Sequence, residues 1–194
     1  LASSAASDVY KRQQRGLCFC AQYTILLLFA VCGAVPTDLC YNHSRIKTNQ
    51  EMDIVTVDRQ KVLDAFAAYI RPYDAQDPKV SLKIHHTYRV ATLCEQIGRS
   101  IALEGTALDL AWLCGMLHDV GRFEQLRRFG TFDDSKSIDH ARAGVQVLFE
   151  QGHIRDYLDD DSEDAMLRTA VEWHSAFRLP EKLDARTRTF SQLL

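Results

Sequence analysis

Apolar side chains recur every three to four residues through most of the chain after residue 57, which is the spacing of one face of an α-helix. In the first such stretch, Val62, Phe66 and Ile70 fall on one stripe. No segment there alternates polar and apolar residues in the manner of a strand. The pattern predicts an all-α helical bundle. We expect helices over 57–70, 78–103, 107–118, 138–150, 163–177 and from about 184 onward, with a charged loop over 124–136.

The first part of the chain has a different pattern. No acidic residue occurs in 9–37, and a basic stretch at 11–15 precedes an apolar run over 17–35. This layout is typical of a signal peptide, with small residues at 32–34 as a cleavage site. A membrane anchor is a second interpretation, although the uninterrupted apolar core is shorter than the ~20 residues of a transmembrane helix.

A third interpretation is that this segment is not native to the protein. Met52 stands where the helical pattern begins and would serve as a start. These interpretations all place the segment outside the fold. We therefore predict an N-terminal extension over 1–51 and a folded domain over 52–194.

Charge and cysteine usage sharpen the picture of the domain. The whole chain has 194 residues and a formal net charge of −3, whereas 52–194 alone holds 18 basic and 23 acidic residues. This acidic balance argues against bulk nucleic-acid binding. Cys94 and Cys114, the domain's two cysteines, fall on apolar helical faces, as expected for core thiols in a reducing compartment. We predict a cytoplasmic protein without membrane contact; if 17–35 is a true signal or anchor, the protein is exported or membrane-bound instead.

Histidines are concentrated in the domain, and four of them lie on four different predicted helices. Each shares its helical face with apolar residues, so each is expected to point toward the core. Burying an imidazole without a partner costs on the order of 1–3 kcal/mol. A shared metal ion removes that cost, because neutral imidazole is a common metal ligand. The four are His86, His118, His140 and His174, and Asp119 follows His118 where an unpaired carboxylate would be expensive.

These residues resemble the signature of the HD-domain superfamily of metal-dependent phosphohydrolases, and the chain is similar to its small bacterial members. His86 opens the sequence HTYRV, which looks like the first motif of the family. His118 and Asp119 look like the family's His-Asp pair, set between an apolar run and a glycine. His140 and His174 match the two extra histidines of members that hold two metals. The resemblance covers roughly 57–194 and implies an HD-domain helical bundle.

The resemblance also implies a divalent transition metal centre, with two ions. His86, His118 and Asp119 would hold the first ion, and His140 and His174 would hold the second together with Asp119. Mixed imidazole and carboxylate ligation suits Mn, Fe, Co, Ni or Zn better than Mg. The implied substrate is a nucleotide or another small phosphorylated molecule, whose phosphate ester a metal-activated hydroxide would cleave.

Three residues are the candidates for catalysis. By resemblance, Asp119 and His118 organise the metals, and Arg122 follows closely enough to bind phosphate through its planar guanidinium. The weaker candidates are Arg89 and Lys136 for phosphate, and Glu124 and Asp139 for orienting a ligand histidine.

One expected ligand has no counterpart in the sequence. The family pattern ends with a metal-binding aspartate on a late helix, but Asp184 lies too near the start of the last predicted helix. The chain ends at Leu194 within that helix, without a capping or stop signal. We therefore expect a domain that is truncated at its C-terminus, with the missing aspartate beyond Leu194.

Two other functions are compatible with the same ligand set. Some HD-fold proteins are di-iron oxygenases that cleave C–C or C–P bonds with oxygen. Others could be non-catalytic, metal-binding regulatory modules. The sequence predicts a small phosphorylated substrate as the partner and makes no prediction of oligomeric state.

Overall fold

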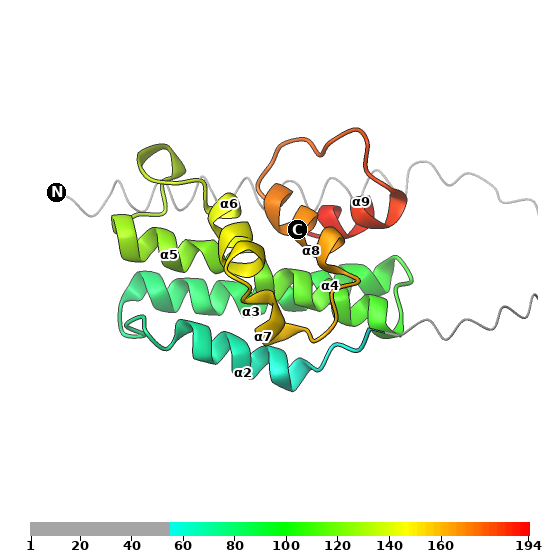
Figure 1. Cartoon of the computed structure of the whole chain (residues 1–194), viewed down its shortest axis with the longest axis horizontal. Helices are drawn as coiled ribbons and strands as arrows, with labels where there is room; N and C mark the ends of the chain where they lie inside the picture. Colours follow the sequence, from blue (N-terminus) through cyan, green and yellow to red (C-terminus); the bar gives the residue numbers. More distant parts are fainter. Residues whose placement is uncertain (1–54) are drawn as a thin grey trace, which may run out of the picture. The chain divides into compact units, whose positions relative to one another are not determined.

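The structure is a computed structural model, and it describes residues 55–194. Within that range the chain is helical and contains no strand, which confirms the predicted fold class (Figure 1). These residues belong to one compact unit, Glu51–Leu194. The predicted extension over 1–51, with its signal or anchor, lies outside the described residues. Among the described helices, none is both long and apolar enough to cross a bilayer.

The helices follow one another with short connections. The longest, α3, begins with Asp77 as its N-cap and Pro78 at its first position, a combination that satisfies an exposed backbone N–H and fixes the backbone for helix formation. The order is α2 (Arg59–Ile70), α3 (Pro78–Ser100), α4 (Gly105–Leu117), α5 (Val120–Phe129), the 3₁₀ turn η1 (Asp134–Lys136), α6 (His140–Val145), the π-helical turn η2 (Gln146–Glu150), α7 (Ile154–Tyr157), α8 (Asp164–Trp173) and α9 (Ala185–Gln192).

The prediction of a loop over 124–136 is wrong for the first half of that range, because α5 continues to Phe129. The many charges of this stretch suggested a loop. However, Phe123 and Leu126 are buried three residues apart, which is the spacing of a helical face. Gly130 ends the helix in the left-handed conformation, with φ of 66°. The short helix α7 was also not predicted, and α8 ends four residues before the predicted boundary.

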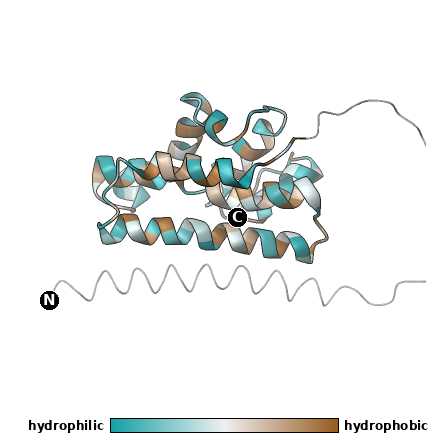
Figure 2. Cartoon of the chain, turned by 90° about the horizontal axis from the view of Figure 1, so that it is seen from below, coloured by the Kyte–Doolittle hydropathy of each residue, from teal (hydrophilic) through white to brown (hydrophobic). Residues whose placement is uncertain are grey.

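Helix α4 lies at the centre of the bundle. Nine of its residues are buried, and it has no polar face, unlike the amphipathic helices around it, which carry both apolar and polar residues (Figure 2). It packs most extensively against α3, which runs beside it (Figure 1). A Cβ added to Gly115 would lie 2.4 Å from the Cα of Ala91, so only glycine permits this close approach.

A second glycine brings α6 against α5. A Cβ on Gly121 would lie 2.1 Å from the carbonyl oxygen of His140 and 2.4 Å from the nitrogen of Gly144. Gly121 and Gly115 therefore stand on either side of the junction between α4 and α5. Together they bring α3 and α6 close to that junction.

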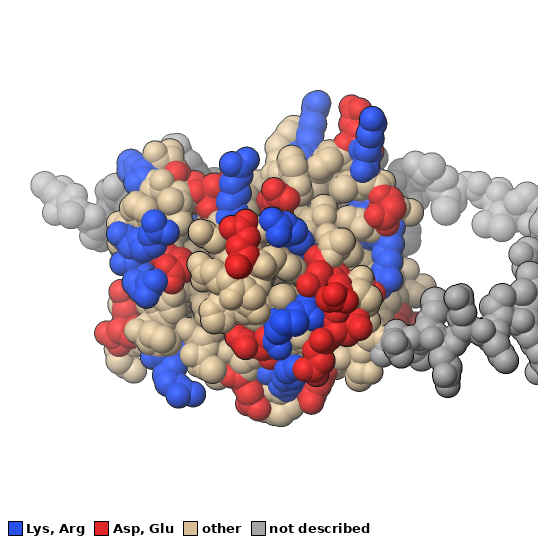
Figure 3. Space-filling view, in the orientation of Figure 1, with Lys and Arg blue, Asp and Glu red and all other residues tan. Residues whose placement is uncertain are grey.

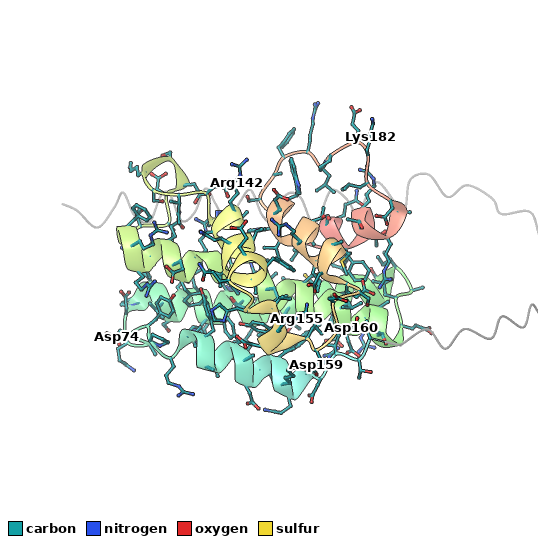
Figure 4. The ribbon with its side chains drawn as sticks, in the orientation of Figure 1. Asp74, Arg142, Arg155, Asp159, Asp160 and Lys182 are labelled. Atoms are coloured by element: carbon teal, nitrogen blue, oxygen red, sulfur yellow. The ribbon has the colours of Figure 1, made fainter. Side chains whose placement is uncertain are left out.

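The other helices complete the bundle around this centre. Helix α7 packs on α2, and α9 packs on α8 (Figure 1). Arg155 of α7 donates to the carbonyl of Asp160, and both residues are labelled in Figure 4. It also donates to the carboxylate of Asp164 and so ties the start of α8 to α7. On the face drawn in Figure 3, basic and acidic side chains are interspersed.

The two cysteines of the domain are free and buried, as expected for core thiols. Burial raises the pKa of Cys94 to about 12 and also raises that of Cys114. Both thiols are therefore held in the protonated, unreactive form at neutral pH.

Candidate metal centre

The junction between α4 and α5 carries a histidine and an aspartate. His118 extends the helical geometry of α4 by one residue, whereas Asp119 departs from it, with φ of −108° and ψ of 15°. Both side chains are buried, at 6% and 4% exposure. A buried carboxylate is costly unless cations or hydrogen-bond donors surround it, so the groups around Asp119 decide what this junction does.

The two carboxylate oxygens of Asp119 face two different pairs of histidines. Oδ2 lies 3.4 Å from Nε2 of His86 and 3.4 Å from Nε2 of His118. Oδ1 lies 3.7 Å from Nε2 of His140 and 3.6 Å from Nε2 of His174. The four histidines come from α3, from the residue after α4, from α6 and from the residue after α8. One carboxylate is thus shared by two three-membered groups of ligand atoms, each compact enough for a metal ion.

The opposite ring nitrogens of three of these histidines are bonded to oxygen acceptors. A carbonyl or an ionised carboxylate only accepts hydrogen bonds, so each Nδ1 carries the proton and, in the neutral ring, each Nε2 presents a lone pair to the site. The Nδ1 atom of His118 lies 2.7 Å from the Gly115 carbonyl, that of His140 2.6 Å from Asp134 Oδ2, and that of His174 2.7 Å from the Val171 carbonyl.

The family model of the HD domain matches residues 84–190, a span that contains Asp119 and all four histidines. The chain belongs to the HD-domain family. HD-domain proteins form a superfamily of metal-dependent phosphohydrolases, and they bind divalent metals. No curated protein and no solved structure matches the chain.

The donor atoms of this HD domain fit a pair of cations. The Nε2 atoms of His140 and His174 lie 2.9 Å apart, and those of His86 and His118 lie 3.2 Å apart. Burial lowers the pKa of His118, and it lowers that of His140 to about 4, so these two rings are neutral at neutral pH. Facing lone pairs at such distances repel each other unless a cation lies between them.

Asp119 remains ionised despite its burial. Burial alone would raise its pKa, but electrostatic interaction with the surrounding histidines, His118 first, holds it well below the usual range. The site therefore offers one carboxylate and four imidazoles as ligands, which is the ligand chemistry of a transition metal centre.

Asp134 orients one of the histidines, and the sequence analysis missed it. Its Oδ2 accepts from His140 Nδ1, and its Oδ1 accepts from Gln125 Nε2 at 2.8 Å and from Arg122 Nη1 at 2.6 Å. Acceptors of this kind fix the tautomer and the orientation of a ligating histidine. The predicted partner Asp139 instead caps α6 by accepting from Ala141 and Arg142 backbone N–H groups.

Arg122, the predicted phosphate binder, is buried beside Asp119. Its Nη1 donates to Gln125, Asp134 and the carbonyl of Phe132, so much of the guanidinium is committed to holding the following loop. Its Nε lies 3.6 Å from Asp119 Oδ1 and has no hydrogen-bond partner among the described residues. One N–H of Arg122 therefore faces the site and remains free for a ligand.

Lys83 is a further residue at the site that the sequence analysis did not identify. Its Nζ donates to Asp119 Oδ2 at 2.7 Å, and its side chain is only 16% exposed. The available signal was its position three residues before His86 on the same helix, which places both residues on one face.

The weaker candidates lie away from this cluster or have other partners. Lys136 is exposed and pairs with Asp133, and Arg89 is exposed. Glu124 accepts from Tyr73 and pairs with Arg127. Asp184 is exposed and caps α9 by accepting from Thr187 N. In residues 55–194, the carboxylates grouped with the site's histidines are Asp119, Asp134 and Asp139.

Proposed function

We propose that this HD domain hydrolyses the phosphate ester of a small phosphorylated molecule, such as a nucleotide, in a metal-dependent reaction. The observation that carries the proposal is the shared carboxylate of Asp119, which presents one oxygen to each of two histidine pairs. Two cations held around one carboxylate suit a displacement at phosphorus, because negative charge accumulates there on several oxygens at once.

The ligands that we propose for the two ions are the groups brought together by the fold. His86, His118 and Asp119 would hold the first, and Asp119, His140 and His174 the second. Bound there, Mn, Fe, Co, Ni or Zn ions would supply Lewis acidity and lower the pKa of a water molecule into the neutral range.

The protein's own groups would bind and orient the substrate. Arg122 Nε, which is buried without a hydrogen-bond partner in residues 55–194, would donate to a phosphoryl oxygen and so satisfy an N–H whose isolation is costly. Its Nη1, fixed by Asp134 and the carbonyl of Phe132, holds the guanidinium plane in place. The apolar helix α4 beneath Asp119 would exclude bulk water and strengthen these electrostatic contacts.

The test is phosphate release from a panel of esters by the full chain loaded with Mn²⁺, including nucleotides, sugar phosphates and p-nitrophenyl phosphate. We expect hydrolysis that EDTA abolishes and that His86→Ala removes. His85→Ala is the matched control, because His85 lies next to His86 but is exposed and bonds its own helix at Ser81. A metal-loaded chain that releases no phosphate from any of these esters would overturn the proposal.

The other functions considered are distinct outcomes of the same experiment. Oxygen uptake by the iron-loaded chain without phosphate release would assign it to the di-iron oxygenases. Metal binding with neither activity would indicate a regulatory module. We also propose that the domain works in a reducing compartment such as the cytoplasm, because Cys94 and Cys114 are free thiols.

A further inference from the structure

Lys83 is a largely shielded cation in direct contact with the central carboxylate. It lies on α3, one turn before His86, and its Nζ is 2.7 Å from Asp119 Oδ2. This is the same oxygen that faces His86 and His118 at 3.4 Å. A buried ammonium group is unfavourable unless it is paired, so the position of Lys83 is determined by the site itself.

The loop after α5 fixes the other side of this lysine. The Nζ of Lys83 lies 5.3 Å from the centre of the Phe132 ring, within the range of a cation–π contact. The carbonyl of Phe132 in turn accepts from Arg122 Nη1 at 2.8 Å. Lys83 is therefore held between the carboxylate and an anchored loop residue.

The ammonium group has hydrogen-bonding capacity left over. It carries three N–H donors and, among the described residues, one of them is used, by Asp119 Oδ2. Arg122 lies on the other oxygen of the same carboxylate, with its Nε 3.6 Å from Oδ1. Two cations thus face the two different oxygens of Asp119, and each keeps a donor free.

We propose that Lys83 is a second phosphate-binding residue, which donates one N–H to Asp119 and another to a phosphoryl oxygen of the substrate. The inference rests on the proposed function. A tetrahedral phosphate presents several oxygens in different directions. Lys83 and Arg122, which face different oxygens of Asp119, would therefore contact different phosphoryl oxygens. With 16% of its side chain exposed, Lys83 is also accessible to solvent.

The competing explanation is that Lys83 serves only as an internal counter-ion for Asp119. The two roles predict different effects of removing the charge. A phosphate-binding lysine is needed for anion affinity and not for metal content. An internal counter-ion competes with metals for Asp119, so its removal would tighten metal binding and leave phosphate affinity unchanged.

The experiment uses Lys83→Met, which keeps the length of the side chain but removes the charge, and Lys83→Arg, which keeps the charge. Lys79→Met is the matched control, because Lys79 lies one turn earlier on α3, is exposed, and donates to the carbonyl of Gly130. Binding of inorganic phosphate to the Mn²⁺-loaded full chain is measured by calorimetry, and metal content by mass spectrometry. A loss of one charge-assisted hydrogen bond predicts phosphate affinity about 10- to 100-fold weaker in Lys83→Met.

The metal content of Lys83→Met should equal that of the wild type, Lys83→Arg should recover part of the phosphate affinity, and Lys79→Met should behave as the wild type does. Unchanged phosphate affinity in Lys83→Met, whether metal binding is tighter or the same, overturns the proposal. Loss of metal from Lys83→Met also overturns it, because Lys83 would then act by positioning Asp119. If the wild type binds phosphate but hydrolyses no ester, the proposed function fails while the role of Lys83 is still decided by the variants.

Discussion

The two histidine pairs that flank Asp119 differ in how firmly the protein holds them. In the pair His140 and His174, which we call the tight pair, the side chains are 4% and 7% exposed, and both Nδ1 atoms are bonded to protein acceptors. In the pair His86 and His118, the open pair, the His86 side chain is 24% exposed. The Nε2 atoms are also farther apart in the open pair, at 3.2 Å against 2.9 Å.

The difference follows from the elements that carry each pair. Helices α6 and α8 pack on each other, so the side chains of the tight pair are largely shielded from solvent. The open pair lies where α3 passes the end of α4, and Lys83 donates to the same Asp119 oxygen that this pair faces. Preorganised ligands lose less entropy on binding, so the tight pair should hold its ion more strongly. The open pair is the side from which substrate and solvent would enter.

The strongest test removes the group that the two pairs share. Asp119→Asn keeps the size of the side chain but removes its charge, and we expect both ions and all hydrolysis to be lost, as measured by metal content and phosphate release. Asp159→Asn is the control, because that side chain is 93% exposed and should leave both properties unchanged. If Asp119→Asn retains two ions, the shared-ligand assignment is wrong.

The next test separates the pairs. His86→Ala should leave one ion, held by the tight pair and released slowly to a chelator, whereas His140→Ala should leave one ion that is released quickly. Metal stoichiometry and the rate of release to EDTA measure the two effects. Equal release rates in the two variants would show that burial does not distinguish the pairs.

A smaller effect is expected from the carboxylate behind the tight pair. Asp134→Asn removes the ionised acceptor of His140 Nδ1, and loss of such a partner typically weakens metal binding about 10- to 100-fold. Titration with a competing chelator should show this loss for one ion only. The neighbouring Asp133→Asn is the control, since Asp133 is 41% exposed and pairs with Lys136. A uniform loss at both ions would contradict a role confined to the tight pair.

The smallest effect is on the pH dependence of stability in the metal-free chain. Burial lowers the pKa of His140 to about 4, whereas a histidine in the unfolded chain has a pKa of about 6.5. The unfolded state therefore binds the proton first as the pH falls below about 6.5. Between there and about pH 4, this residue should reduce the free energy of unfolding by up to about 1.4 kcal/mol per pH unit.

Urea unfolding in EDTA at pH 7 and pH 5 measures this dependence. His140→Gln should lose that part of the slope, and His85→Gln should retain it because His140 is still present. If His140→Gln has the slope of the wild type, burial of His140 does not control its protonation.

The site residues differ in how readily the sequence reveals them. His86, His118, His140 and His174 are identifiable because each lies on an apolar helical face. Lys83 was detectable in principle, from its spacing to His86, but lysines on helices are usually solvated, and nothing in the sequence marks this one as buried. Asp134 gives no such signal, because it lies in a loop where no periodicity relates it to His140.

Helix α5 shows the same distinction at the level of secondary structure. Its many charged residues, among them Arg127 and Arg128, indicate a loop when composition alone is used. Its apolar residues Phe123 and Leu126 indicate a helix only once the structure shows that both are buried in the core. Gly130, a glycine in the left-handed conformation, marks the end of the helix locally, whereas packing of the buried face is what reveals the helix itself.

The sequence by itself determined the all-α fold class and the family resemblance, and it predicted the five side chains that the fold brings together, because helical periodicity and side-chain chemistry are local properties of the chain. Only the tertiary structure decided that one carboxylate faces two unequal histidine pairs. It also decided that the Arg122 guanidinium donates mainly to the loop after α5, and that Lys83 and Asp134 lie at the site. Those relations depend on how closely the helices approach, which two glycines set at the α4–α5 junction, and contacts between distant segments leave no periodic signal in the sequence.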